Sequence, residues 1–335
     1  MIKKVLVYLT NPHGHVWNFA PRHLETMRSV IPELVVCQNS KEFLDQLPNA
    51  EAVIVWHFKK DWLGLAPELR LIATPAAGAD WIEIRATDRL KVVFGSFHGS
   101  MIAESVVGAI FYFCKAFKLS REMQNERKWA RVKISEKLGS LYRARVTILG
   151  FGNIGREIGR AVKPFGCLIT GVKRTPATPP PYFTPEDRVV TVDSLPEVLK
   201  TTDHLIMSLP SQRAGKSLPA TKSDPQLQAV GYDGDGERLF TRELFRMLPP
   251  HCLFYNVGRG DVYREKDLVE ALQNREIAGA YLDVFETEPL PESSPLWEMD
   301  NVLIQPHLSA ASPQYLDLYF AELKSKWHQL DPADG

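Results

Sequence analysis

Short apolar runs alternate with amphipathic helical segments over the first hundred residues of the chain. Two of the segments between the runs, Val16–Val30 and Lys41–Leu47, repeat their apolar residues with the spacing of a helix. Runs rich in β-branched residues that alternate with helices are typical of a parallel sheet in an α/β fold. The strands that we expect in this region are Lys3–Leu9, Leu34–Gln38, Ala52–Trp56, Leu69–Thr74 and Lys91–Gly95.

A second alternating series begins at Arg145 and continues to about Phe285. It is followed by one more strand, Asn301–Gln305, and by a helix, Pro313–Gln329, which we expect to return to the first region. The strands expected in the second series are Arg145–Leu149, Cys167–Val172, Arg188–Val192, His204–Leu209, Cys252–Asn256 and Ala278–Val284.

The two series predict two domains. A chain of 335 residues suits this number, because single cores rarely grow beyond ~250–300 residues before they split. We expect a discontinuous domain of residues 1–100 and 300–335, into which a second domain of residues 101–299 is inserted. Both should be doubly wound α/β domains built on parallel sheets.

A long helical stretch between the two series begins near Ala103 and runs to about Trp129. Its apolar residues are too many to form a single stripe, so we expect this helix to be buried on more than one side. Such a pattern fits a domain junction, a subunit interface, or both, and we expect a homodimer built on this helix. The apolar residues are Val106, Val107, Ile110, Phe111, Phe113, Cys114 and Phe117.

Composition excludes several classes of protein. Forty basic residues balance forty acidic ones, so the chain lacks the basic surface that nucleic-acid binding requires. The longest apolar run, Val106 to Cys114, is far shorter than the ~20 residues of a membrane helix. The four cysteines form no CxxC pair, which indicates free thiols in a reducing compartment. We therefore expect a cytoplasmic protein with no membrane or nucleic-acid partner.

Two other motifs are incomplete. His13 and His15 resemble a pair of metal ligands, but the loop offers no third ligand nearby, so we predict no metal. In the polar stretch 211–238, Gly215-Lys216-Ser217 resembles a phosphate loop, but Pro210 stands where its first glycine is required. We expect this stretch to be an exposed loop.

A glycine motif, Gly150-Phe151-Gly152-Asn153-Ile154-Gly155, follows the strand Arg145–Leu149 and opens a helix, Asn153–Val162. In a Rossmann domain the first glycine makes the tight turn, the second lets a pyrophosphate approach the backbone, and the third lets helix and strand pack closely. The amide groups and the dipole at the start of the helix attract the phosphates. We expect cofactor contacts from Gly150, Gly152, Asn153, Ile154 and Gly155.

Three later segments each place a polar residue just beyond the carboxyl end of an expected strand, where ligands bind in open α/β sheets. Arg259 follows Asn256-Val257-Gly258, Glu288 precedes Pro289, and His307 follows Gln305-Pro306. Reduction of a 2-keto acid by hydride transfer requires a cation for the carboxylate and the developing alkoxide, an acid that protonates this oxygen, and a carboxylate that keeps the acid charged. Arg259, His307 and Glu288 supply these three groups.

Together with the glycine motif, these segments resemble the D-2-hydroxyacid dehydrogenase family, which includes glyoxylate reductases and hydroxypyruvate reductases. The resemblance covers nearly the whole chain. It implies a Rossmann dinucleotide domain inserted in a flavodoxin-like substrate domain. It also implies that Arg259 binds the 2-keto acid, that His307 is the acid/base, that Glu288 pairs with His307, and that Asp283 contacts the nicotinamide carboxamide.

The resemblance extends to two segments of the first half of the chain. Ala76-Ala77-Gly78-Ala79-Asp80 is similar to the family's glycine loop, which implies that backbone amides at Ala77 and Gly78 hold the substrate carboxylate. Met101-Ile102-Ala103-Glu104 resembles the start of the family's long helix. The stretch 211–238 departs from the family, because it is roughly twenty residues longer than the link expected there.

The residues after the strand Cys167–Val172 favour NADP(H) over NAD(H), although NAD(H) can still bind. NAD sites typically carry Asp or Glu here, which binds the ribose hydroxyls. This chain carries Lys173, Arg174 and Thr175, with no acid before Glu186, and this set suits a 2′-phosphate. The alternative is that both cations are solvated residues at a strand end.

A different class of protein shares this architecture. The fold also resembles a transcriptional corepressor that senses its cofactor, and fold alone does not distinguish a regulator from an enzyme. The complete set of arginine, carboxylate and histidine favours the enzyme.

Overall fold

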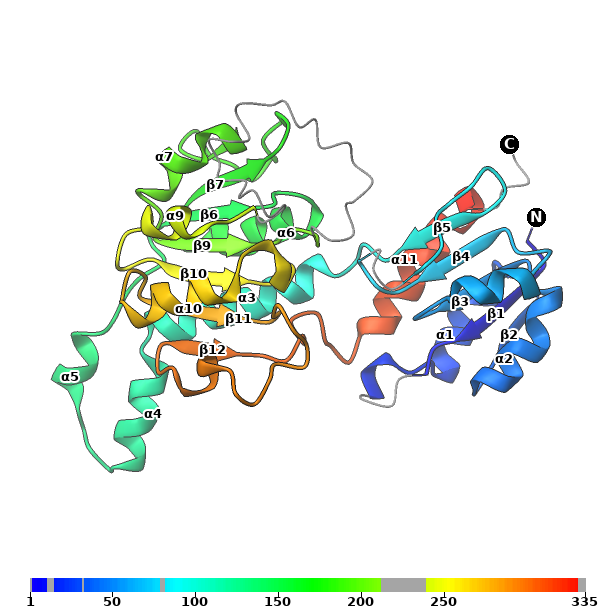
Figure 1. Cartoon of the computed structure of the whole chain (residues 1–335), viewed down its shortest axis with the longest axis horizontal. Coiled ribbons are helices and arrows are strands. Elements are labelled where there is room, and N and C mark those ends of the chain that lie inside the picture. Colours follow the sequence, from blue (N-terminus) through cyan, green and yellow to red (C-terminus); the bar gives the residue numbers. More distant parts are fainter. Residues whose placement is uncertain (1, 11–14, 32, 79–81, 212–238, 331–335) are drawn as a thin grey trace. The chain divides into compact units, whose positions relative to one another are not determined.

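The computed structural model describes residues 2–10, 15–31, 33–78, 82–211 and 239–330 (Figure 1). The chain forms two compact units, Met1–His98 with Ala311–Gly335, and Gly99–Ala310. The first crossing between the units lies close to the expected boundary at residue 100. The second lies at Ala310 rather than at residue 300, because the strand that follows residue 300 joins the sheet of the inserted unit.

The first unit is built on a five-stranded sheet with the order β2-β1-β3-β4-β5. All of its strand pairs are parallel, and β1 lies between β2 and β3, with Val5 opposite both Leu34 and Ala52. This order is the flavodoxin-like doubly wound order, as expected. The strands are β1 (Lys4–Tyr8), β2 (Glu33–Val36), β3 (Ala52–Val55), β4 (Leu71–Thr74) and β5 (Lys91–Phe94).

Helices from both ends of the chain complete this unit. The C-terminal helix α11 (Tyr315–Leu330) packs against α1 (Pro21–Met27) and buries Phe320 and Trp327. The helix expected at Val16–Val30 was placed too early, because residues 15–17 form a separate 3₁₀ turn before Pro21 opens α1. The remaining helices are α2 (Ser40–Gln46), η1 (His15–Trp17), η2 (Leu47–Asn49) and η3 (Lys60–Leu65).

The second unit is built on a seven-stranded parallel sheet with the order β12-β11-β10-β9-β6-β7-β8. Strand order reverses between β6 and β9, which is the point where a Rossmann fold binds its dinucleotide. The strands are β6 (Arg145–Leu149), β7 (Leu168–Lys173), β8 (Arg188–Thr191), β9 (His204–Met207), β10 (Leu253–Asn256), β11 (Gly279–Leu282) and β12 (Val302–Ile304).

Helices cover both faces of the seven-stranded sheet. On one face, α3 (Gly99–Cys114) and α6 (Asn153–Val162) pack against each other and share a core with β6. On the other face, α7 (Leu195–Leu199), α9 (Arg242–Arg246) and α10 (Glu265–Gln273) form a second core. The 3₁₀ helices are η5 (Lys163–Phe165), η6 (Val192–Ser194), η8 (Gly260–Val262) and η9 (Pro295–Glu298).

The expected continuous helix from Ala103 to Trp129 is wrong. Helix α3 ends at Cys114, Ala116 adopts a left-handed conformation with φ of 48°, and a separate helix α4 (Phe117–Asn125) follows. A short helix α5 (Arg131–Ser135) comes next. Over the described ranges, no single helix combines the length and hydropathy of a membrane span, and α3 with α4 reaches them only as a pair bent by 59°.

Candidate active site

The glycine motif forms a tight turn between β6 and α6. Gly150 has a φ of 95°, and a Cβ atom there would lie 2.8 Å from the backbone of Ser208. A Cβ atom at Gly155 would lie 2.6 Å from the carbonyl oxygen of Gly150, so both positions require glycine. By contrast, a Cβ atom at Gly152 would meet nothing within 4 Å. The backbone at the start of α6 is therefore open to a ligand on this side.

The end of β7 is joined to this turn. The carbonyl oxygen of Val172 accepts hydrogen bonds of 3.1 Å from both Gly150 N and Phe151 N. Lys173 is the last residue of β7, and Arg174 and Thr175 follow it at the exposed surface. Within the described part of the chain, no carboxylate pairs with Lys173 or Arg174. An open helix start beside the cations Lys173 and Arg174 fits a dinucleotide.

Arg259 lies on a turn that buried Asn256 organises at the end of β10. Asn256 Oδ1 accepts a 3.0 Å hydrogen bond from Gly258 N, and Asn256 Nδ2 donates a 2.9 Å hydrogen bond to the carbonyl oxygen of Arg259. The glycines on either side of Arg259 allow neighbouring chain segments to approach. A Cβ atom at Gly258 would lie 2.5 Å from the carbonyl oxygen of Leu209, and one at Gly260 would overlap the backbone of Phe285.

His307 and Glu288 form a hydrogen-bonded pair. His307 Nδ1 lies 2.7 Å from Glu288 Oε2, and Glu288 Oε1 accepts a 3.0 Å hydrogen bond from Phe285 N. The side chains of His307 and Glu288 are 41% and 35% exposed, so solvent or a substrate reaches both of them. His307 has a φ of 54°, and its amide donates a 2.8 Å hydrogen bond to the carbonyl oxygen of Asp283.

The two partners shift each other's protonation. The hydrogen bond and the charge of Glu288 raise the pKa of His307, although partial burial and the Arg259 guanidinium oppose the shift. Burial works to raise the pKa of Glu288, but His307, the Phe285 amide and Arg259 together hold it below its ordinary value. The contributions of Arg259 to both shifts indicate that its charge lies near the pair. An ionised carboxylate beside a histidine of raised pKa is the arrangement of a general acid held ready to donate a proton.

Asp283 supports the turn that carries His307. Its Oδ1 atom accepts hydrogen bonds from Leu308 N at 2.7 Å and from Ser309 N at 2.9 Å, and its Oδ2 atom accepts one from the Ser309 hydroxyl. Burial raises the pKa of Asp283, and these hydrogen bonds partly offset the shift. Ser105 of α3 donates a further 3.0 Å hydrogen bond to the carbonyl oxygen of Ser309. The structure therefore gives Asp283 a supporting role at this turn, and its contact with nicotinamide stays a prediction.

Sequence reasoning missed the supporting roles of Asn256 and Ser309. Asn256 opens the segment that carries Arg259, and Ser309 lies two residues after His307, but nothing in the sequence states which backbone groups their side chains bind. One pattern in the sequence could have indicated these roles, namely a polar residue at the end of an otherwise apolar strand. A polar side chain that is buried there must form a hydrogen bond with a nearby group.

The expected carboxylate-binding residues Ala77 and Gly78 lie in the five-stranded unit, directly after β4. Thr74 Oγ1 accepts a 3.2 Å hydrogen bond from Ala76 N, and Gly95 N donates to the carbonyl oxygen of Ala76 at 3.0 Å, so this turn is tied to the neighbouring strand. Arg259, Glu288 and His307 all lie in the seven-stranded unit. Ala79 and Asp80 fall outside the described residues.

Several other expectations fall partly or wholly outside the described part of the chain. They concern residues 212–238, with the Gly215-Lys216-Ser217 motif that they contain, and the side chains of His13 and His15. Within the described part, no three His, Cys, Asp or Glu residues are grouped so that they could hold a metal ion. All four cysteines are free and buried.

Comparison with known proteins identifies relatives of both halves of this architecture. The model of the D-isomer specific 2-hydroxyacid dehydrogenase NAD-binding domain matches residues 107–223 and 220–309. A glyoxylate reductase/hydroxypyruvate reductase of Homo sapiens is 29% identical over 73% of this chain and 68% of its own length. A glyoxylate/hydroxypyruvate reductase of Arabidopsis thaliana is 26% identical over 94% of this chain and 83% of its own length.

A solved structure extends the likeness to the whole fold. A D-isomer specific 2-hydroxyacid dehydrogenase family protein from Aeromonas salmonicida is 27% identical, covers 99% of this chain and 98% of its own, and superposes with a TM-score of 0.76. The family model alone spans more than half of the chain, and its residues include the glycine motif, Arg259, Glu288 and His307. The chain is thus an NAD(P)-dependent oxidoreductase that acts on CH–OH donors, and it belongs to the D-isomer specific 2-hydroxyacid dehydrogenase family.

Proposed function

We propose that this enzyme is an NADP(H)-dependent reductase of a small 2-keto acid, such as glyoxylate or hydroxypyruvate, and that it forms the D-2-hydroxy acid. The observation that carries the proposal is the pair formed by His307 and Glu288, at a separation of 2.7 Å, in a position that a substrate can reach. A cofactor-sensing regulator requires the fold and the cofactor, but it does not require a solvent-accessible acid of raised pKa.

The residues divide the work of reduction. The cofactor supplies the hydride when it is bound. His307 donates a proton to the carbonyl oxygen of the substrate from its Nε2 atom, while its Nδ1 atom faces Glu288. Glu288 stabilises the protonated ring, and Arg259 binds the substrate carboxylate and stabilises the negative charge that develops on the oxygen. We assign the substrate domain to the five-stranded unit, where the amides of Ala77 and Gly78 hold the carboxylate.

A panel of 2-keto acids with NADPH, followed by the loss of absorbance of the reduced cofactor, tests this function. We expect turnover with glyoxylate or hydroxypyruvate in the unmodified enzyme and its loss in His307→Ala. Binding of NADPH without turnover of any acid in the panel would favour the regulator instead.

Lys173 and Arg174 carry the preference for NADP(H). Both lie at the end of the strand that is bonded to the glycine turn, and the described residues provide no carboxylate partner for either of them. A protein from Rhizobium etli with the same fold has been solved in complex with NADP, so the fold accommodates the phosphorylated cofactor. We expect kcat/KM to be higher with NADPH than with NADH, and the double variant Lys173→Ala, Arg174→Ala to lose about tenfold or more of this ratio. A wild-type enzyme that prefers NADH would contradict the assignment.

The homodimer remains part of the proposal, with a revised interface. In Figure 1, α4 and α5 project away from the sheet of their own unit. Large apolar side chains are exposed along this arm, including Trp129 at 95% and Val132 at 71%. Exposed apolar patches of this kind usually mark an interface. A monomeric mass in light scattering at micromolar concentration would contradict a dimer.

The free cysteines support a cytoplasmic location, which cell fractionation tests.

A further inference from the structure

The connection between β7 and β8 has an unusual construction. The two strands are parallel neighbours, so the chain must cross from the end of one to the start of the other. Such crossovers are usually helices. Here residues 174–187 cross without a helix or strand, and five of them are proline. Because Arg174 and Thr175 open this crossover, its anchoring determines where they lie.

One anchor joins the middle of the crossover to α6. The Tyr182 hydroxyl donates a 2.6 Å hydrogen bond to the carbonyl oxygen of Arg156, and Arg156 Nη2 donates a 3.2 Å hydrogen bond to the carbonyl oxygen of Thr178. Gly159 provides the space that Tyr182 occupies, since a Cβ atom at Gly159 would lie 2.7 Å from the tyrosine oxygen. This helix is the one whose first turn follows the glycine motif.

A second contact reaches the glycine motif itself. The ring of Phe183 packs against the ring of Phe151 with a centroid distance of 5.5 Å. Phe151 lies in the sequence between the first two glycines of the motif, Gly150 and Gly152, and it is fully buried. A Cβ atom at Gly171 of β7 would lie 2.4 Å from the Phe151 ring, so a glycine on the strand makes room for it. Side chains of the crossover, the glycine motif and β7 therefore form one packed group.

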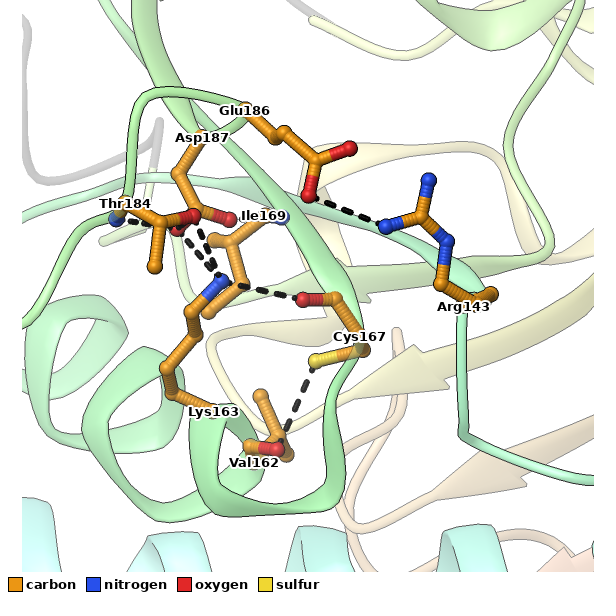
Figure 2. Close-up of polar contacts among 8 residues, drawn as sticks. All are labelled: Arg143, Val162, Lys163, Cys167, Ile169, Thr184, Glu186 and Asp187. Atoms are coloured by element: carbon orange, nitrogen blue, oxygen red, sulfur yellow. Dashed lines mark hydrogen bonds and ion pairs between the residues drawn. The ribbon is translucent and has the colours of Figure 1, made fainter.

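The last anchor is a buried ion pair at the end of the crossover (Figure 2). Lys163 Nζ lies 2.5 Å from Asp187 Oδ2, and the Asp187 side chain is 0% exposed. Asp187 also accepts hydrogen bonds from Ile169 N at 2.8 Å and from Thr184 N at 2.7 Å. This residue thus fixes the returning chain to β7 and to the end of α6 at once.

We propose that the crossover 174–187 acts as a brace for cofactor selection, and that Tyr182, seated at Gly159, is its positioning residue. The brace fixes Lys173 and Arg174 relative to the start of α6, so that the 2′-phosphate and the pyrophosphate of one NADP(H) molecule meet groups already held at the correct separation. This inference rests on the proposed preference for NADP(H). Affinity gained in this way comes from cations that are ordered before binding, which lowers the entropic cost of binding the phosphate.

Two variants loosen the brace in different ways. Tyr182→Phe removes the hydroxyl but keeps the ring, and Gly159→Ala displaces Tyr182 with a methyl group while it favours the helix. The matched controls are Glu186→Gln, which removes an exposed carboxylate from the same crossover, and Gly64→Ala, where the added methyl group meets nothing within 4 Å. Titration calorimetry of each protein with 2′,5′-ADP and with 5′-AMP measures the part of the affinity that the 2′-phosphate contributes.

We expect Tyr182→Phe and Gly159→Ala to bind 2′,5′-ADP about threefold to tenfold more weakly, with little change in the affinity for 5′-AMP, as the loss of one ordering hydrogen bond implies. Both controls should behave like the unmodified protein. Equal losses for the two nucleotides would overturn the inference, because a general structural defect weakens both. The proposed cofactor preference fails separately, when the unmodified protein binds 2′,5′-ADP no more tightly than 5′-AMP, or when the Lys173→Ala, Arg174→Ala variant keeps the full effect of the 2′-phosphate; the brace then falls with it.

Discussion

Two carboxylate–cation pairs of the seven-stranded unit have nearly the same geometry and opposite surroundings. Glu288 lies 2.7 Å from His307, and both side chains are more than a third exposed. Asp187 lies 2.5 Å from Lys163, with exposures of 0% and 16%. The two pairs also differ in the other hydrogen-bond partners of their side chains. Asp187 is saturated by backbone amides and a threonine hydroxyl. His307 uses its Nδ1 atom for Glu288, and among the described residues none forms a hydrogen bond with its Nε2 atom, which can therefore serve a substrate.

The comparison shows how one type of contact serves two purposes. Burial works to raise the pKa of Asp187, but Lys163 and the hydrogen bonds from Ile169 and Thr184 hold it below its ordinary value. That pair holds the chain in place. The other pair includes His307, and the charge of a histidine changes near neutral pH. Its partner Glu288 therefore controls the pKa of a group that can transfer its proton.

The largest effect should come from His307→Ala. Loss of a general acid typically lowers turnover about 10²–10⁴-fold, and because the side chain is half exposed the melting temperature should change little. Steady-state reduction kinetics and thermal unfolding measure the two quantities. His251→Ala is the matched control, because His251 forms a similar 2.7 Å pair with Asp203 at the surface. If His307→Ala unfolds more easily but turns over normally, the pair of His307 and Glu288 stabilises the fold and does not transfer the proton.

Asp187→Asn should lower the free energy of unfolding by about 3–5 kcal/mol, because it leaves the Lys163 charge poorly compensated in a largely buried site. Since the pKa of Asp187 is lowered in the folded state, its stabilising contribution is present above the ordinary pKa and is lost as pH falls through the folded one. Denaturant unfolding at neutral and acidic pH measures both effects. The exposed pair of Arg143 and Glu186 provides the control, and Glu186→Gln should change stability little.

Glu288→Gln should shift the pH profile of reduction to lower pH. Glu288 raises the pKa of His307, and reduction requires the protonated ring, so activity falls as pH rises through this pKa. Without the carboxylate the pKa is lower and the decline begins earlier. Profiles of kcat/KM against pH for the two proteins check the shift. An unchanged alkaline limb would show that Glu288 does not control the proton.

The smallest effect should come from Ser309→Ala. The variant removes one of the hydrogen bonds by which Asp283 holds the His307 turn, and we expect kcat to fall about threefold to tenfold. Because Ser309 is expected to act through His307, the affinity for NADPH should stay the same. Fluorescence titration with NADPH separates the two outcomes, and a parallel loss of affinity would instead indicate a defect of the whole sheet edge.

The sequence predicted the parts of this architecture that local patterns encode. Both parallel sheets follow from alternation, and helix α6 was expected with the bounds that it has, because a glycine turn marks its start. Arg259, Glu288 and His307 stand just beyond strands, so their common position at one sheet edge could be anticipated.

Features that depend on the path of the chain were not predictable. The long helix was expected to continue because its apolar residues continue, but a left-handed Ala116 ends it. The domain boundary was set before β12, since a pattern identifies a strand but not the sheet that it joins. Likewise Asp187 gives no sign in the sequence that it meets Lys163, because their contact depends on a crossover whose course the prolines constrain but do not specify.

The insertion of one unit into the other has a consequence for how the protein is made. As the chain leaves the ribosome, the seven-stranded unit has all its strands once β12 has emerged. The five-stranded unit, although its strands are made first, must wait for α11, whose Phe320 packs against Phe19 and His23. Since domains generally fold as units during synthesis, the later-made unit is expected to fold first, while the earlier one exposes an apolar surface that chaperones recognise.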